Sequence, residues 1–158
     1  MAIELTPKGT HGMEFSKAAR RIIGAMRGLS AAAYRLLGSR MQMQGVPFLL
    51  LETVGARTGK RRRALLPRFQ DTRPGTWLVT ATALGSARHP AWYFNLANDP
   101  DDVWVEVDHR RLKVRAESLT GVESDEAWRR IVAAAPRFGA YRQKTDRVIP
   151  VVRLTPTT

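Results

Sequence analysis

FLLLETVGARTGKRRRALLPRF, residues 48–69, is the stretch that decides the fold of this chain of 158 residues. Its first part, Phe48–Val54, is an apolar run that predicts a buried strand, and Ala64–Phe69 predicts a second strand. Two glycines between the strands bend the backbone. We therefore expect a pair of strands joined by the basic segment Gly55–Arg63.

Further strands and two helices follow this pair. The additional strands are expected at Thr76–Ala81, Val103–Val107, Leu112–Glu117 and Val148–Leu154. Helices are expected near residues 90–98, where Pro90 starts the helix, and over residues 124–134, where Ser124 is the N-cap. Because the helices are inserted among successive strands, we predict a mainly β (α+β) single domain over residues 1–158, with a small barrel and peripheral helices.

An amphipathic pattern precedes the strands. Over residues 13–38, apolar side chains recur at three- and four-residue steps from Phe15 to Leu37, with basic residues such as Lys17 and Arg20 between them. This pattern predicts a helix that either packs on the core with a solvated basic face, or lies on a membrane surface or over a pocket. In the last case we expect it to cover the acceptor pocket and the barrel to fold without residues 1–36.

The localisation follows from what the sequence lacks. The chain has no cysteine, which excludes disulfides, thiolate nucleophiles and thiolate metal sites. Residues 1–13 lack the apolar stretch of a secretory signal, and the longest strongly apolar run, Pro47–Leu51, is far shorter than the roughly 20 residues of a membrane helix. We expect a cytoplasmic protein, with the N-terminal helix as the candidate for peripheral contact with the inner membrane face.

The charge is strongly positive and uneven. The net charge is +12, and residues 1–75 carry 14 basic and 4 acidic side chains, whereas residues 76–158 carry 12 and 10. Such a field attracts polyanions: nucleic acid, an anionic membrane or a phosphorylated cofactor. No aromatic residue is interleaved with Arg57–Arg63 to stack on bases, so we do not expect a nucleic-acid partner.

The basic segment predicts an anion site. Five of the seven residues from Arg57 to Arg63 are basic, and mutually repelling cations on one tight loop favour a bound anion over a solvated hairpin. The segment is not a P-loop, because the spacing from Gly55 to Gly59 is one residue short and Arg61 stands where the magnesium-binding Ser or Thr should be.

Histidines and aromatic residues give weaker signals. His11, His89 and His109 are scattered, so a metal site is not expected. His89 lies beside a helix start without a carboxylate partner nearby in sequence, which favours a cap or surface residue over a catalyst. Phe138 and Tyr141 fall in a glycine-containing loop, where we expect them to line a pocket mouth.

Three separated motifs resemble the actinobacterial deazaflavin (coenzyme F-420)-dependent nitroreductase family, in the right order and over about residues 15–154. They are Leu50–Gly59 followed by Arg62, then His89–Leu96, then Thr145–Val151. The resemblance implies a split β-barrel of the FMN-binding, pyridoxamine-phosphate-oxidase-like type over residues 46–154. It also implies coenzyme F-420, an 8-hydroxy-5-deazaflavin, in preference to FMN. The phosphate and oligoglutamate tail of that cofactor is polyanionic, which accounts for the basic segment.

The resemblance also implies where the cofactor lies. Residues that match the phosphate-binding loop, or add charge within reach of the glutamate tail, are Arg57, Thr58, Lys60, Arg61, Arg62 and Arg63. Thr80, Thr82 and Ala83 match the strand end whose backbone meets the deazaflavin ring, and Trp92 matches an aromatic residue beside the cofactor.

Substrate residues are implied in the same way. Phe138 and Tyr141 match aromatic residues of the substrate pocket, and Tyr141 is the carried-over candidate for a catalytic proton donor. Members with nitroreductase activity commonly carry lysine, glycine and tyrosine where this chain has Ala83, Leu84 and Phe138. These departures bear on the choice of substrate.

The sequence thus predicts an F-420-dependent reductase that transfers a hydride to a small-molecule electron acceptor: a quinone, nitroaromatic or activated enone. The alternative is a non-catalytic carrier that uses the same barrel to hold a lipid or another apolar ligand, which the absence of lysine at Ala83 would permit. The oligomeric state stays open.

Overall fold

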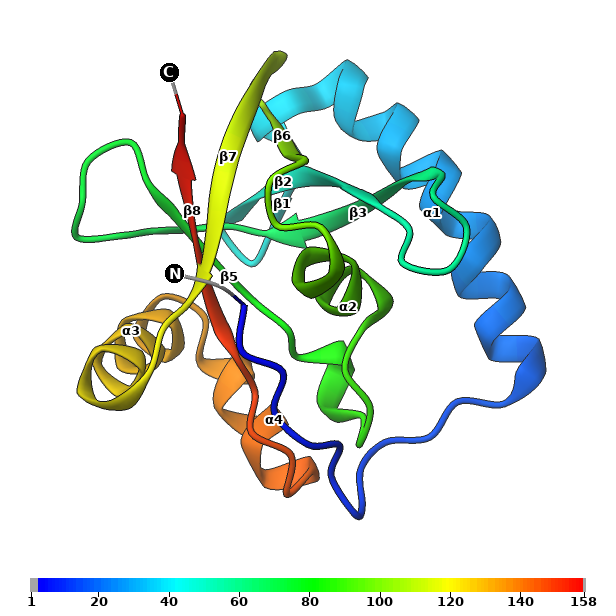
Figure 1. The fold of residues 1–158 in the computed structure, drawn as a ribbon, viewed down its shortest axis with the longest axis vertical. Coiled ribbons are helices and arrows are strands. Elements are labelled where there is room, and N and C mark those ends of the chain that lie inside the picture. The colour runs from blue at the N-terminus through cyan, green and yellow to red at the C-terminus, as the bar shows by residue number, and fades with distance from the viewer. Residues whose placement is uncertain (1–2, 158) are drawn as a thin grey trace.

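An antiparallel sheet of eight strands forms the centre of the computed structural model, which describes residues 3–157 apart from the side chains of residues 23–28. The strands are β1 (Gln42–Met43), β2 (Val46–Val54), β3 (Arg61–Pro67), β4 (Phe69–Gln70), β5 (Trp77–Thr80), β6 (Val103–Val107), β7 (Arg110–Ser118) and β8 (Val151–Pro156). Their order is β1-β2-β6-β7-β8-β5-β4, and β3 pairs with β2. The sheet is curled, so that β7 and β8 run across the direction of β2 and β3 (Figure 1).

Four α-helices surround the sheet in the part of the chain that the structure describes (Figure 1). They are α1 (Lys17–Leu37), α2 (Ala91–Asn98), α3 (Gly121–Ala134) and α4 (Gly139–Lys144). Short 3₁₀ helices lie at Gly38–Arg40, Ala83–Gly85 and Pro136–Phe138. The mainly β architecture with peripheral helices is therefore confirmed.

Two hydrophobic clusters share the strands of the sheet. Successive side chains of a strand point to opposite faces, so Leu78 and Val151 join one cluster while their neighbours Val79 and Val152 join the other. The barrel cluster also contains Leu49 of β2. The second cluster lies against α3 and α4. Its members from those helices and the turn between them are Ala127, Trp128, Ile131, Ala135, Phe138 and Tyr141.

The predicted starts of three elements were wrong by three residues. β3 begins at Arg61 rather than Ala64, because it continues the ladder with β2 up to the pair Val54 and Arg61. Helix α3 has Thr120 as its N-cap, so the expected cap Ser124 lies within the helix. β8 begins at Val151, directly after Pro150, which has no N–H to donate to a ladder. Residues 148–150, which were expected to start the strand, therefore lie outside it.

Residues 3–16, hereafter the N-terminal strap, cross the end of the barrel before α1 begins. Ile3 belongs to the barrel cluster, and backbone N–H groups of the strap donate to the carbonyls of Gly85 and Ala87. Asp146 accepts hydrogen bonds from the hydroxyl and N–H of Thr10, which hold the pKa of its carboxyl at about 2. The expectation that the barrel folds without residues 1–36 stays a prediction, and the structure adds that the strap supplies Ile3 to the barrel cluster.

Helix α1 packs on the barrel through its C-terminal part. Tyr34 is buried and its hydroxyl donates to the carbonyl of Phe48 at 3.1 Å, while Arg35 pairs with Glu106 at 2.8 Å. An apolar row on the same helix stays in solvent, with Leu29 and Leu36 exposed by 73% and 83%. The helix is thus anchored without burying its whole apolar face. Among the described residues, no helix is both long enough and apolar enough to cross a membrane.

Candidate active site

The connection between β2 and β3 is a tight loop that requires both of its glycines. The N–H of Gly55 donates to the carbonyl of Lys60, and the N–H of Gly59 donates to the carbonyl of Gly55, both at 2.8 Å. A Cβ at Gly55 would lie 2.8 Å from Oγ1 of Thr58, and Gly59 has a φ of +67°. These bonds give the basic segment a defined backbone shape.

A buried amide from α2 supports the same loop. Asn95, 7% exposed, accepts a hydrogen bond from the N–H of Ala56 at 3.0 Å and donates one to Oγ1 of Thr53 at 3.1 Å. Asn95 lies within the second motif of the family resemblance, which assigned it no role. The available signal was an amide flanked by apolar residues inside the short helix Ala91–Asn98.

The basic side chains divide between two faces of β3. Arg63 donates to Glu52 at 3.2 Å and Arg61 pairs with Asp102 at 2.8 Å. Arg62, between them, points to the other face, because side chains alternate along a strand, and it donates to Oγ1 of Thr58 at 3.4 Å. The structure therefore does not gather all five cations around one point.

Glu52 forms ion pairs with Arg61 and Arg63, the arginines on one face of β3. Burial alone would raise the pKa of its carboxyl, but hydrogen bonding and attraction from Arg111, together with the charges of Arg63 and Arg61, lower that pKa below its ordinary value. Glu52 consequently stays ionised and neutralises part of the cluster. Arg57, Lys60 and Arg62 make no ion pair with any carboxylate in the described part of the chain. We call these three the loop cations.

A strained turn follows β5. Thr80 is buried at the strand end, and the Ala83–Gly85 turn comes directly after Thr82. A Cβ added at Gly85 would lie 2.9 Å from Cβ of Lys144 and 3.5 Å from the carbonyl oxygen of Tyr141. The structure thus brings the strand end implied for the deazaflavin ring against α4, which carries an implied substrate residue.

His89 and Arg147 form a buried pair behind this turn. Nη1 of Arg147 donates to Nδ1 of His89 at 2.8 Å, and Nε2 of His89 donates to the carbonyl of Thr6 at 2.8 Å. Burial, and then the charge of Arg147, lower the pKa of His89, so its imidazole is neutral. The expectation that His89 is a cap or surface residue was wrong, since it is buried and connects the strap to Arg147.

Phe138 and Tyr141 do not lie in a loop. They belong to the Pro136–Phe138 turn and to α4, and both are buried in the second cluster with ring centroids 5.3 Å apart. The expected placement at a loop-built pocket mouth is wrong, because packing against Phe69 and the sheet makes this segment helical. Their role toward a substrate stays a prediction. The hydroxyl of Tyr141 makes no hydrogen bond with the described residues.

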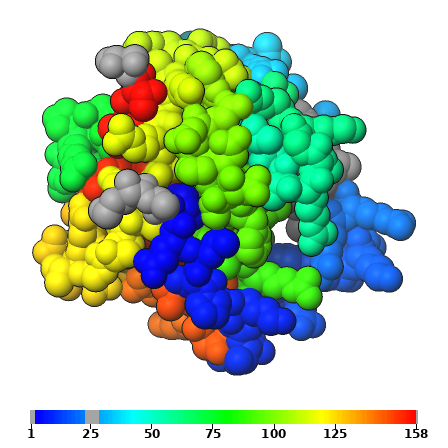
Figure 2. Space-filling view, viewed as in Figure 1, coloured from blue at the N-terminus to red at the C-terminus, as the bar shows by residue number. Residues whose placement is uncertain are grey.

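The remaining implied residue, Trp92, is 8% exposed in the barrel cluster, edge-on to Tyr93. Figure 2 shows a hollow between the teal loop after β2, the green segment that leads into α2, and the blue helix α1. The loop after β2 and the segment that leads into α2 therefore border one recess. No group of three potential metal ligands occurs among the described residues.

The fold places the chain in a known structural class. A pyridoxamine 5'-phosphate oxidase structure from Listeria innocua superposes with a TM-score of 0.50 at 10% identity, covering 82% of this chain and 92% of that one. At this identity the likeness establishes the fold alone, which is the expected split β-barrel. The fold defines the class of the chain as a split-barrel protein.

Comparison with more similar proteins gives the family. A family model described as F420H(2)-dependent quinone reductase matches residues 26–156. An F420H(2)-dependent quinone reductase of Mycobacterium tuberculosis is 34% identical over 150 residues, covering 90% of this chain and 99% of the relative. The chain belongs to the F420H(2)-dependent quinone reductase family, and its cofactor is the reduced deazaflavin F420H2.

Two solved structures agree with this assignment. The structure of an F420-H2 dependent reductase, FDR-A, has a TM-score of 0.61 at 36% identity and covers 68% of this chain and 93% of that one. A second, described as a domain-swapped dimer, has a TM-score of 0.61 at 32% identity and covers 82% and 98%. The predicted resemblance, split barrel, cofactor and reductase activity are confirmed.

Proposed function

We propose that the loop cations Arg57, Lys60 and Arg62 hold the phosphate and glutamate tail of the cofactor. The observation that carries this proposal is the division of the basic cluster. These three charges have no described carboxylate partner on a loop whose backbone is fixed, whereas Arg61 and Arg63 already pair with Asp102 and Glu52. A fixed loop with uncompensated cations suits a polyanionic group, because charge-assisted hydrogen bonds to it are strong.

Arg61 and Arg63 then act at longer range. Their side chains are 44% exposed, so the ion pairs leave part of each guanidinium in solvent. We assign to them the attraction of the glutamate tail rather than direct phosphate contact. Thr58 orients Arg62 through its hydroxyl.

The ring of the cofactor is proposed to lie between α2 and the turn after β5. Thr80, Thr82 and Ala83 would offer backbone groups to it, and Trp92 would border it. When bound, the reduced deazaflavin supplies the hydride, and the protein contributes orientation and exclusion of water. The acceptor is a quinone, in accordance with the family, and Phe138 and Tyr141 would border it.

Tyr141 is proposed to hold the proton that completes reduction. Its hydroxyl has no described protein partner, and α4 lies against the turn after β5. A tyrosine Oη–H within reach of a quinone oxygen can donate as the oxygen gains charge. The proton is returned from solvent after product release.

The N-terminal helix is proposed to contact anionic membrane surfaces. Ile22, Leu29 and Leu36 are spaced seven residues apart on α1 and are all exposed, and Lys17 and Arg20 lie on the same helix. An exposed apolar row with cations on the opposite face of the helix is the arrangement of an interfacial helix. Such contact would bring the reductase to the inner membrane face, where apolar quinones dissolve.

The proposed function is tested by two measurements on the purified protein. Titration of oxidised F-420, followed by its fluorescence, should give saturable binding that weakens with salt, because exposed charges are screened. Mixing the reduced complex with a naphthoquinone should restore the oxidised cofactor's absorbance. Binding without oxidation would contradict the reductase assignment, and absence of binding would contradict the loop site.

A further inference from the structure

The turn after β5 contains a side chain that neither backbone preference nor burial explains. Ala83 and Leu84 have φ of +43° and +55°, the left-handed region that glycine adopts without cost. Leu84 is nevertheless 46% exposed. A strained residue persists only where the surrounding structure imposes it, and such residues concentrate at functional sites.

Arg147 imposes this conformation. Its Nη2 donates to the carbonyl of Thr82 at 2.8 Å and its Nε to the carbonyl of Ser86 at 2.9 Å, so one guanidinium binds the backbone on both sides of the strained pair. Arg147 is 4% exposed and is itself positioned by His89. One buried side chain therefore holds the backbone on both sides of the strained pair.

The turn that carries Leu84 borders the proposed acceptor site through Gly85, the next residue. On one side lies α4, since Gly85 approaches Lys144 and the carbonyl of Tyr141. On another side lies the strap, where the N–H of Met13 donates to the carbonyl of Gly85. Met13 is also exposed. Leu84 is an exposed apolar side chain directly before Gly85, and such a side chain is suited to contact a flat apolar ring.

We propose that Leu84 is a specificity-determining residue that contacts the apolar ring of the quinone, and that Arg147 is the positioning residue that fixes it there. The inference rests on the proposed function, because it assigns part of the same acceptor site. Leucine at this position favours flat apolar acceptors, since burying its side chain against a ring removes apolar surface from water.

The test compares Leu84→Gly and Leu84→Met with a control, Leu5→Gly. Leu5 is 51% exposed and has no left-handed φ, so its replacement by glycine adds chain entropy without relieving strain. Three quantities are measured for each variant. They are the Tm, the Kd of oxidised F-420, and the Kd of a short-chain naphthoquinone from quenching of tryptophan fluorescence in the cofactor-free protein.

Leu84→Gly should leave the Tm unchanged or raise it by up to about 2–4 °C, because strain relief offsets the added entropy. Its naphthoquinone Kd should rise roughly 3- to 10-fold, the loss of part of one leucine contact, with the F-420 Kd unchanged. Leu84→Met should retain quinone affinity. Leu5→Gly should lower the Tm and leave both Kd values unchanged.

An unchanged quinone Kd in Leu84→Gly, or no quinone binding by the wild type, would overturn the proposal. A fall in Tm together with loss of both ligands would also overturn it, since Leu84 would then be a structural residue. Failure of the proposed function has a different signature. The wild type would bind quinone but not F-420, and the quinone Kd values would still decide the role of Leu84.

Arg147 is tested by Arg147→Lys and Arg147→Gln. Lysine keeps the charge but cannot bind the carbonyls of both Thr82 and Ser86. If Arg147 acts by holding these two carbonyls, both variants should therefore weaken quinone binding. Rescue by lysine would show that the charge alone is needed and would overturn the positioning role. A folded spectrum accompanies the expected result, and the F-420 Kd should rise as well, because Arg147 holds the carbonyl of Thr82 in the turn that is proposed to meet the cofactor ring.

Discussion

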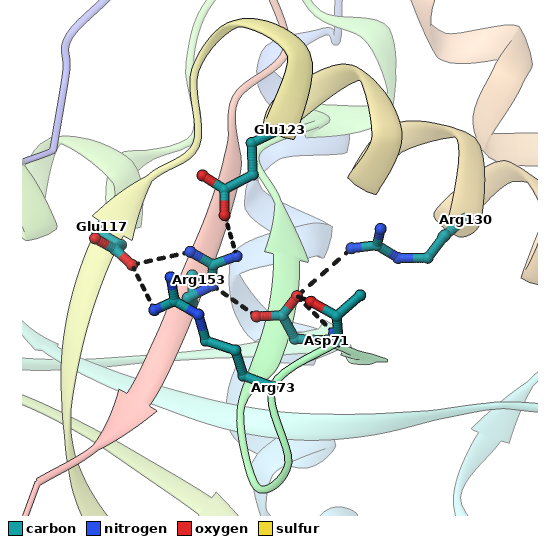
Figure 3. A network of polar contacts seen from close by, with 7 residues as sticks. Asp71, Arg73, Glu117, Glu123, Arg130 and Arg153 are labelled. Atoms are coloured by element: carbon teal, nitrogen blue, oxygen red, sulfur yellow. Dashed lines mark hydrogen bonds and ion pairs between the residues drawn. The ribbon is translucent and has the colours of Figure 1, made fainter.

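Nε of Arg153 on β8 lies 2.6 Å from Oδ2 of Asp71, and both side chains are almost completely buried (Figure 3). The same guanidinium donates to Glu117 of β7 and to Glu123 of α3. Burial would raise the pKa of Asp71, but the hydrogen bond from Arg153 lowers it below its ordinary value. This network joins α3 to the sheet and so fixes the helical layer that carries the second cluster.

Asp71→Asn should lower the free energy of unfolding at pH 7 by about 3 kcal/mol, because it removes one partner of a buried pair. The folded pKa of Asp71 is depressed, so its contribution is present above the unfolded value of about 4 and is lost as pH falls through the folded value. Urea unfolding at pH 7 and pH 3 measures this. The difference between variant and wild type should shrink at pH 3.

Asp108→Asn is the matched control. Asp108 pairs with Arg68 at 3.3 Å but is 46% exposed, so its pair is worth at most about 1 kcal/mol. Asparagine also tolerates the positive φ of this position. Equal losses of unfolding free energy in the two variants would show that the buried Asp71 network stabilises the fold no more than an exposed ion pair does.

Neighbouring arginines should separate cofactor binding from stability. Arg62→Ala should weaken F-420 binding about tenfold and flatten its salt dependence, because it removes a loop cation. Arg63→Ala should change F-420 affinity less than threefold and lower stability slightly, because it removes one partner of Glu52. Fluorescence titration at two salt concentrations checks both. Equal losses of affinity would show that the two faces of β3 serve the cofactor alike.

The sequence predicted the strands whose apolar runs are long, and it failed where charge or loop formers obscured a strand or helix. Arg61–Arg63 look like a loop because they are basic, yet they are strand residues with exposed side chains. Gly139 and Pro136 suggested a loop at Phe138, yet burial against Phe69 makes the segment helical. Tertiary packing overrides local propensity at such places.

The candidate site was predicted only in part for a similar reason. The density of basic residues pointed to the loop between β2 and β3, but not to the carboxylates that pair with two of its five cations. Glu52 pairs with Arg63 across the β2–β3 ladder and with Arg111 of β7, 59 residues away. The roles of Asn95 and Arg147 were missed because each side chain binds backbone groups of segments that are distant in the sequence. A local sequence pattern does not show such contacts.

Helix α1 gives a prediction on membrane binding. Leu29→Glu should reduce binding to vesicles of anionic phospholipid at least tenfold, because it places a negative charge within the exposed apolar row. Val122→Glu, at a 72% exposed position on α3, is the control and should bind as the wild type. Co-sedimentation at low and physiological salt checks this. Equal binding by all three proteins, or none by the wild type, would contradict a membrane role for α1.

Asn95 gives a prediction on the anion loop. Asn95→Ala should raise the F-420 Kd several-fold, because the N–H of Ala56 loses its acceptor and the loop its support from α2. Asn95→Asp keeps an acceptor for that N–H but adds a negative charge beside the loop, so it should weaken binding further. Only the aspartate variant should show a salt dependence smaller than that of the wild type. An alanine variant with wild-type affinity would show that the loop holds its shape unaided.

Tyr141→Phe tests the proton donor. A positioned acid is worth roughly 100- to 10,000-fold in rate, so single-turnover oxidation of the reduced cofactor by a naphthoquinone should slow at least tenfold. The KM for quinone should change little, because phenylalanine keeps the packing on Phe138. Tyr34→Phe is the control. It removes a hydroxyl that bonds the carbonyl of Phe48 far along the chain from α4, and should cost about 1 kcal/mol of stability with an unchanged rate. A Tyr141→Phe rate within a factor of about two of wild type would mean that solvent supplies the proton and that Tyr141 only packs.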